Sequence, residues 1–137
     1  MGLCESDRDH TSTLRNVLVI DDNPAIVKAL ATRLMAMGWG CMTALDGYDA
    51  MALMAKHPVD AVVTDLDMPY IDGFGILELA SSFNGCPVMV MTGSPDAAQR
   101  CREDFPNVPV LHKPFTSQQV LSWLESLAPK ADTQSAA

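Results

Sequence analysis

Charged and hydroxylic side chains stand at the ends of four short apolar runs in this chain. Asp21 and Asp22 come directly after the first run, and Asp65 ends the second. Thr92 follows the third run, and Lys113 follows the fourth. If the runs are parallel strands, these side chains meet at one edge of a sheet, outside the carboxyl ends of the strands, where ligands bind in such folds. Three carboxylates, a hydroxyl and an ammonium placed together could bind a divalent cation and hold a phosphoryl group on a carboxylate.

The segments around these residues alternate between apolar runs and helical patterns, which is typical of an α/β fold with a parallel sheet. The clearest helix follows Asn23, a favourable N-cap, and Pro24, which suits the first helical position. Gly38 is placed to end this helix. Apolar residues recur between them at spacings of three and four and predict one buried stripe, made of Ile26, Leu30, Leu34 and Met37.

The other helical patterns are shorter. Asp46 can cap one of them, and Thr116 opens the last with a T-x-x-Q capping box. The helix that begins after Ser94 is the weakest, because residues 96–102 offer only two alanines and Cys101 for burial. We expect this helix to be short, lightly anchored and mobile.

Five β/α units predict a doubly wound, flavodoxin-like (βα)5 fold, in which a five-stranded parallel sheet has the order 2-1-3-4-5. We expect residues 16–128 to form one domain, flanked by flexible tails at residues 1–15 and 129–137. The first six residues match a pattern for N-myristoylation. That pattern is short and often matched by chance, so we interpret these residues as part of the tail.

Composition argues against several classes of protein. The 137-residue chain has a formal net charge of -8, which disfavours nonspecific nucleic-acid binding, since such binding needs Lys and Arg to neutralise phosphates. No apolar stretch approaches the roughly 18 residues that cross a bilayer, so no membrane contact is expected. The four cysteines are widely spaced and resemble reduced thiols of a cytoplasmic protein more than a disulfide framework or a zinc site.

Taken together and in order, the strand-end motifs resemble the receiver domain of bacterial two-component response regulators, the CheY-like family. The resemblance covers roughly residues 16–128, nearly the whole chain beyond its tails. Each motif alone has low specificity for the family, whereas all of them together and in this order have high specificity. The motifs lie at residues 19–23 (VIDDN), 64–69 (TDLDMP), 72–73 (DG), 91–93 (MTG) and 113–115 (KPF).

The resemblance implies a phosphoacceptor and a metal site. Asp65 would take a phosphoryl group from a phosphohistidine on a histidine kinase or a histidine phosphotransfer protein. Asp21 and Asp22, with the Asp65 carboxylate and the backbone carbonyl of Asp67, would hold Mg²⁺ or Mn²⁺, which prefer hard oxygen ligands. The cation would offset the repulsion among the carboxylates, so we expect metal to raise the melting temperature.

The resemblance also implies ligands for the phosphoryl oxygens. Lys113 would pair with one oxygen, and the Thr92 hydroxyl would move inward to bind another, which is the switch of this family. The bond between Lys113 and Pro114 would be cis and would aim the lysine at the site.

Four positions bear on how the signal is passed on. Val110 stands where the family often has an aromatic ring that rotates with the threonine, so output would rely on loop and helix movement instead. Gly93 stands where alanine is usual and gives its loop more freedom. Asp67 and Ser94 occupy positions that influence autodephosphorylation in this family. The Asp67 side chain would either add negative charge near the metal or point to solvent.

We therefore predict a stand-alone signalling switch that acts in two-component or phosphorelay signalling and catalyses only its own phosphorylation and dephosphorylation. Because only a short tail follows the last helix, output would occur by protein contact or phosphotransfer. The expected contact face comprises the helix after Ser94, the fifth strand and the last helix. We expect a cytoplasmic monomer or weak homodimer.

Two alternatives fit parts of the pattern. Haloacid-dehalogenase-type phosphatases also form an aspartyl-phosphate, and the D-x-D pattern of Asp65 and Asp67 is similar to theirs. Those enzymes place their remaining acids after the lysine, whereas Asp21 and Asp22 precede it and few residues follow Lys113. A pseudo-receiver, which binds partners without phosphorylation, usually lacks an acid, the threonine or the lysine, and this chain has all of them.

Overall fold

The computed structural model describes residues 15–68, 75–78 and 86–127 of the chain. Five parallel strands form one sheet with the order β2-β1-β3-β4-β5, as the sequence predicts. The strands are β1 (Asn16–Ile20), β2 (Gly40–Ala44), β3 (Ala61–Asp65), β4 (Val88–Thr92) and β5 (Val110–His112). The helices with defined bounds are α2 (Pro24–Ala36), α3 (Gly47–Lys56), α5 (Pro95–Asp104) and α6 (Ser117–Leu127), and residues 75–78 are also helical.

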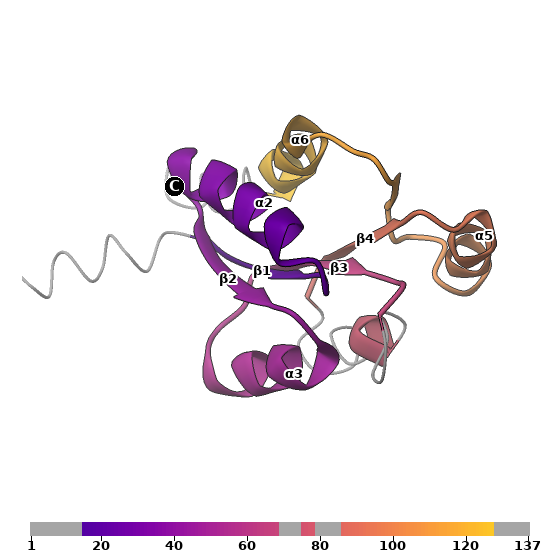
Figure 1. Cartoon of the computed structure of the whole chain (residues 1–137), viewed down its shortest axis with the longest axis horizontal. Helices are drawn as coiled ribbons and strands as arrows, with labels where there is room; N and C mark the ends of the chain where they lie inside the picture. Colours follow the sequence, from indigo (N-terminus) through magenta and orange to yellow (C-terminus); the bar gives the residue numbers. More distant parts are fainter. Residues whose placement is uncertain (1–14, 69–74, 79–85, 128–137) are drawn as a thin grey trace, which may run out of the picture.

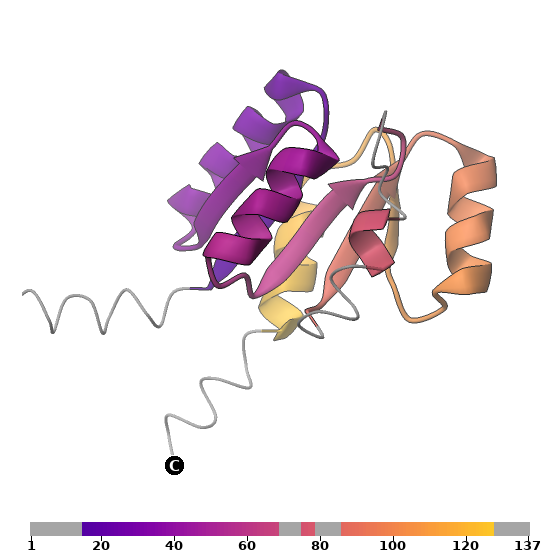
Figure 2. The same cartoon turned by 90° about the horizontal axis from the view of Figure 1, so that it is seen from below.

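Helices cover both faces of the sheet, which explains why the central strands are almost continuously apolar. Figures 1 and 2 show α2 and α6 over one face and α3 over the other. Alternate residues of each strand therefore enter two separate cores. Val17, Val19 and Val63 pack with α2 and α6, whereas Leu18 and Ile20 pack with α3, residues 76–77 and α5.

The ends of α2 follow from local chemistry. The Asn23 side chain accepts a hydrogen bond from the Ala25 amide, and Pro24 is the first helical residue. Gly38 has a φ of 96°, a left-handed conformation that glycine adopts without strain. The Gly38 and Trp39 amides donate to the carbonyls of Met35 and Leu34, which completes a Schellman motif.

The predicted stripe of α2 is partly wrong. Met37 is 52% exposed because α2 ends at Ala36 and Met37 is the C-cap, where the helical period no longer applies. Ile26 is only half-buried. The residues that α2 buries are Val27, Leu30, Ala31 and Leu34.

The remaining helix predictions hold within the described residues. Asp46 and Ser94 accept hydrogen bonds from the Asp49 and Ala97 amides as N-caps of α3 and α5. Thr116 and Gln119 bond each other's amides, which forms the predicted capping box before α6. Helix α5 has ten residues and buries only Ala98 and Cys101 fully, as expected from its composition, while its mobility stays a prediction.

Several predictions fall outside the described residues. These are the two tails, Cys4 and the DG motif at residues 72–73. Among the described cysteines, Cys41, Cys86 and Cys101 are free thiols. Within the same part of the chain, none of the helices has the length and apolar character that crossing a membrane requires.

Candidate functional site

The predicted site residues meet at the carboxyl edge of the sheet. Asp21 follows β1, Asp65 ends β3, Thr92 ends β4 and Lys113 follows β5. The strand register brings these ends level, since Ile20 pairs with Thr64 and Thr92 pairs with His112. The side chains of Asp21, Asp65 and Thr92 are buried, with exposures of 0%, 1% and 0%. The apolar strands therefore place these polar side chains together at the edge of the hydrophobic core.

Three carboxylates form the acidic part of the site. Ligand oxygens of Asp21, Asp22 and Asp65 all lie within 4.8 Å of one another. The Asn23 amide donates to Asp21 Oδ1 at 3.0 Å, and the Asp67 amide donates to Asp65 Oδ1 at 3.1 Å. These bonds from the following turn fix the direction of each buried carboxylate. The resulting set of hard oxygen donors fits Mg²⁺ or Mn²⁺.

Lys113 supplies the positive charge at this edge. Its Nζ donates to Asp21 Oδ2 at 2.9 Å and lies 3.3 Å from Asp65 Oδ2. The side chain is a quarter exposed, so it reaches the site from the surface. The bond between Lys113 and Pro114 is cis, as predicted.

Burial and the neighbouring charges together shift two pKa values in the site. Burial raises the pKa of Asp65, and the nearby Asp21 carboxylate adds to the rise, although the Asp67 amide and Lys113 oppose it. Burial by itself would lower the pKa of Lys113, but its hydrogen bond to Asp21 and the charges of Asp65 and Asp21 more than compensate and raise that pKa. A bound divalent cation would relieve the cost of keeping Asp65 ionised.

Thr92 and Asp67 are joined directly. The Thr92 hydroxyl donates to Asp67 Oδ2 at 2.8 Å, and the Gly93 amide donates to the same oxygen at 3.4 Å. The Ser94 amide in turn donates to the Thr92 hydroxyl at 2.9 Å. From the sequence, the Asp67 side chain could either lie near the metal or point to solvent. In the structure its carboxylate accepts a hydrogen bond from Thr92 instead. The sequence identifies Asp67 as a position of interest because it lies two residues after Asp65. Its hydrogen-bond partner, Thr92, is at the end of the neighbouring strand β4 and is visible only in the structure.

The secondary positions have structural roles as well. Ser94 is the N-cap of α5. A methyl group added at Gly93 would meet Lys113 Cβ at 4.0 Å, an ordinary contact, so alanine would fit there. Val110 is half-buried at the start of β5 and packs against the core that includes α3 and α5. On the same strand, His112 Nε2 lies 2.8 Å from Arg102 on α5, which links that helix to β5.

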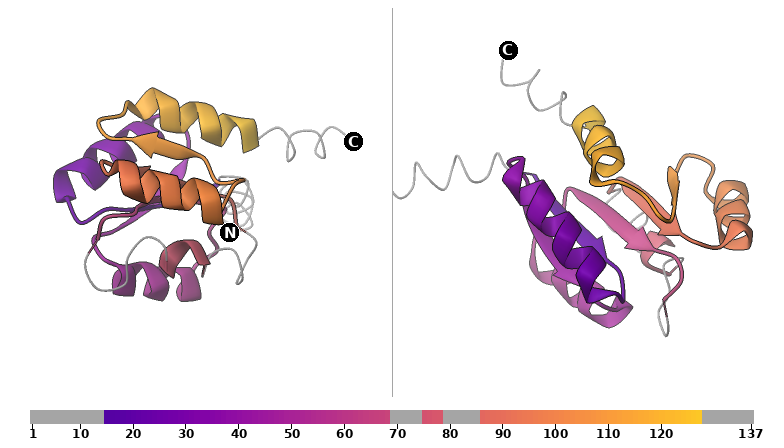
Figure 3. Two further views of the ribbon diagram at one scale, coloured as in Figure 1. Left: turned by 90° about the vertical axis from the view of Figure 1, so that its right-hand side faces the viewer. Right: turned by 45° about the horizontal axis from the view of Figure 1, so that its top comes forward.

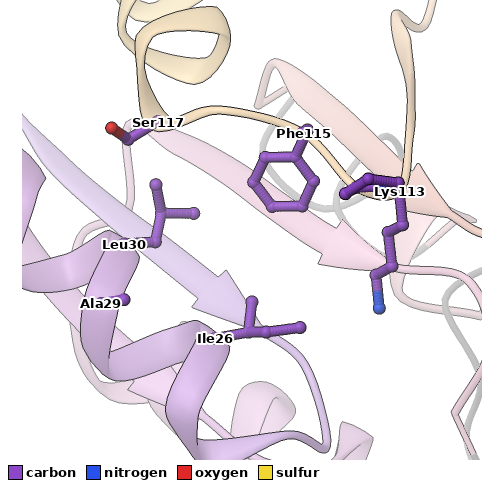
Figure 4. Close-up of a pocket in the computed structure, with 7 residues that line it drawn as sticks. Ile26, Ala29, Leu30, Lys113, Phe115 and Ser117 are labelled. Carbon is purple, nitrogen blue, oxygen red and sulfur yellow. The ribbon is translucent and has the colours of Figure 1, made fainter.

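An apolar cavity of about 580 Å³ opens beside Lys113. Figure 4 shows Ile26 and Leu30 of α2 facing the ring of Phe115, which follows the cis bond. The cavity lies between α2 and the segment that leads into α6. Its lining comprises Ile26, Ala29, Leu30, Lys113, Pro114, Phe115 and Ser117.

Comparisons with known proteins agree with this geometry. Residues 17–125 match the family model of the response regulator receiver domain. A transcriptional regulatory protein, KdpE of Mycobacterium tuberculosis, is 32% identical over 111 residues, which are 80% of this chain and 49% of that protein. The sensor histidine kinase RcsC of Escherichia coli is 34% identical over 90 residues, which are 64% of this chain and 10% of the kinase. The chain thus spans half or less of these curated relatives.

Solved structures share the fold. The chemotaxis protein CheY4 of Vibrio cholerae is 27% identical with a TM-score of 0.71, and the match covers 82% of this chain and 98% of that one. The receiver domain of the Francisella response regulator 1452 is 25% identical with a TM-score of 0.75, covering 85% of this chain and 98% of that one.

Proposed function

The chain belongs to the response regulator receiver family of two-component signalling, and on that premise we propose that Asp65 accepts a phosphoryl group from the phosphohistidine of a partner protein. The carboxylate oxygen would form the new bond to phosphorus while the bond to the histidine nitrogen breaks, and the electron pair leaves with the imidazole. The donor would be a histidine kinase or a histidine phosphotransfer protein. The chain would catalyse only this transfer and the later loss of the phosphoryl group.

The observation that carries the proposal is the convergence of buried Asp65 with two acids and one lysine. Phosphoryl transfer needs positioning and charge neutralisation more than covalent assistance. Asp21, Asp22 and Asp65 would hold Mg²⁺, with the Asp67 carbonyl, and the ion would supply charge neutralisation. Lys113 already lies within 3.3 Å of an Asp65 oxygen, so it is placed to pair with a phosphoryl oxygen there.

Acetyl phosphate and Mg²⁺, followed by intact mass measurement, test the proposal. The wild-type chain should gain one phosphoryl group, and Asp65→Asn should gain none. Asp96→Asn, which changes an exposed acid at the start of α5, is the matched control and should still react. A wild-type chain that binds Mg²⁺ yet gains no mass would contradict the proposal. Rapid turnover of phosphomonoesters would point to a phosphatase.

We extend the proposal to the face that passes the signal on. Figure 3 shows β5 lying between α5 and α6, and α5 is the helix with the fewest buried residues among those with defined bounds. Arg102 and His112 join α5 to the strand that leads directly to Lys113. A change at Lys113 can therefore reach α5 through one short strand. A downstream protein would bind this face of a monomer or weak homodimer.

A further inference from the structure

The Thr92 hydroxyl already donates one hydrogen bond and accepts another before any phosphoryl group is present. A hydroxyl has one proton to donate. The Ser94 amide donates to Thr92 Oγ1, so the Thr92 proton is directed to its other neighbour, Asp67 Oδ2, at 2.8 Å. Thr92 is 0% exposed while Asp67 is in place, so both hydrogen-bond partners of its hydroxyl are neighbouring groups of the chain. Another anion can receive this proton only when Asp67 releases it.

The same Asp67 oxygen draws a second donor. The Gly93 amide lies 3.4 Å from Asp67 Oδ2. A hydroxyl and a main-chain amide directed at one point are a donor set for an anionic oxygen. Asp67 is tied to the phosphoacceptor as well, because its own amide donates to Asp65 Oδ1 at 3.1 Å. A carboxylate of the chain thus occupies donors that lie beside Asp65.

We propose that Asp67 is a built-in competitor of the phosphoryl group, whose carboxylate holds the Thr92 hydroxyl in the resting protein and must release it before a phosphoryl oxygen can bind there. This inference rests on the proposed function of Asp65. Asp67 is a positioning residue in this scheme, since it acts through Thr92. Its effect is to weaken the binding of the phosphoryl group and to keep the switch off.

Competition by a charged acceptor predicts a definite order of variants. Hydrogen bonds to ionised groups are roughly twice as strong as neutral ones. Asp67→Asn keeps an acceptor oxygen without the charge, and Asp67→Ala removes both. Affinity for a phosphoryl analogue should therefore rise from wild type to Asp67→Asn to Asp67→Ala, by about tenfold in total. Asp67 is exposed, so both variants should keep the fold.

Calorimetric titration with beryllofluoride at saturating Mg²⁺ tests the order. The double-mutant cycle with Thr92→Val isolates the direct contact, because valine has the shape of threonine without the hydroxyl. In the Thr92→Val protein the Asp67 carboxylate still repels the anionic probe, but it no longer accepts a hydrogen bond from residue 92. The gain from Asp67→Ala should fall there to about twofold or less. The Gly93 amide resonance should also shift in Asp67→Ala before any probe is added.

Two controls separate the possible failures. Asp96→Asn removes one exposed charge at the start of α5 and should change the affinity by less than about twofold. If Asp67→Ala gives no gain, or the same gain with Thr92→Val, the competition is overturned while the proposed function stands. If the wild type binds Mg²⁺ but no beryllofluoride, both the proposed function and the competition are overturned.

Discussion

The acidic side of the site and its cationic side are supported by very different amounts of packing. Asp21 follows β1 and Asp65 ends β3, two neighbouring inner strands in which all residues but Asn16 are buried. Lys113 follows β5, an edge strand of three residues, none of which is fully buried. The neighbouring helices repeat the contrast, because α2 buries four residues and α5 buries two.

This difference separates two tasks. Metal ligands must be held in one geometry, and densely packed strands resist displacement. A segment that reports a change must move at small cost, and elements with few buried contacts open most easily. The two sides are joined by Lys113, which bonds the buried Asp21 while it follows the weak strand. We therefore expect substitutions of the same kind to have unequal effects on the two sides.

The largest contrast should come from Leu→Ala substitutions in the two strands. Leu18 of β1 is fully buried, and Leu111 of β5 is half-buried. Leu18→Ala should lower the free energy of unfolding by about 2–5 kcal/mol, and Leu111→Ala by roughly half as much or less. Urea unfolding measures both. Equal losses would show that β5 is packed as firmly as β1.

Removing the lysine tests how the two sides are joined. In Lys113→Met, Asp21 and Asp65 lose their counter-charge, so the metal-free protein should lose about 1–3 kcal/mol, less than for a fully buried pair because Lys113 is partly exposed. Added Mg²⁺ should then raise the melting temperature more than it does in the wild type. Lys28→Met, on the exposed side of α2, is the control. A smaller Mg²⁺ effect in Lys113→Met than in the control would contradict this account.

The raised pKa of Asp65 predicts a pH dependence of stability. Because the folded pKa lies above the ordinary value of 3.8, the folded state binds the Asp65 proton more readily than the unfolded state does. The contribution of Asp65 to the free energy of unfolding is therefore full below pH 3.8 and is lost as the pH rises through the pKa of the folded state. In EDTA, Asp65→Asn should therefore become more stable relative to wild type as the pH rises through that window.

Saturating Mg²⁺ is the control for this titration. The wild type then gains binding free energy that Asp65→Asn, which lacks one ligand, cannot gain in full. The order of stabilities should reverse. Urea unfolding at a series of pH values, with and without metal, checks both halves of the expectation. A stability difference that stays constant with pH in EDTA would refute it.

The smallest effect is expected from the link between α5 and β5. Arg102→Ala removes the hydrogen bond to His112, which is exposed, so global stability should change by less than about 0.5 kcal/mol. Hydrogen exchange of the α5 amides should nevertheless become faster, while that of α2 should not change. Arg100→Ala, which removes an exposed ion pair to Asp104 within α5, is the matched control. Unchanged exchange in α5 would mean that other contacts hold the helix.

Much of the fold can be predicted from residues that act on the backbone within a few positions of themselves. Asn23 and Ser94 cap helices because their side chains bond amides two or three residues on. Gly38 ends α2 because it adopts a positive φ. The parallel sheet follows from the alternation of apolar runs and helices, and its order is one of the common doubly wound orders. The placement of Asp21, Asp65, Thr92 and Lys113 at one edge follows in turn, since parallel strands align their carboxyl ends.

Other features depend on neighbours far away in the chain. Helical spacing placed Met37 in the buried stripe, but the exact end of α2 exposed it. The Asp67 carboxylate had no partner visible in the sequence, because Thr92 lies 25 residues away. The same holds for Lys113 and Asp21, which are 92 residues apart.

The sequence by itself determined the elements, their order and the set of groups that the sheet presents at its edge. These depend on backbone preferences and apolar periodicity, which act over a few residues. Only the tertiary structure decided which of these groups bond to one another. Asp67 holds Thr92, and Lys113 holds Asp21 and Asp65, because hydrogen bonds between side chains require ångström placement that only the packed strands provide.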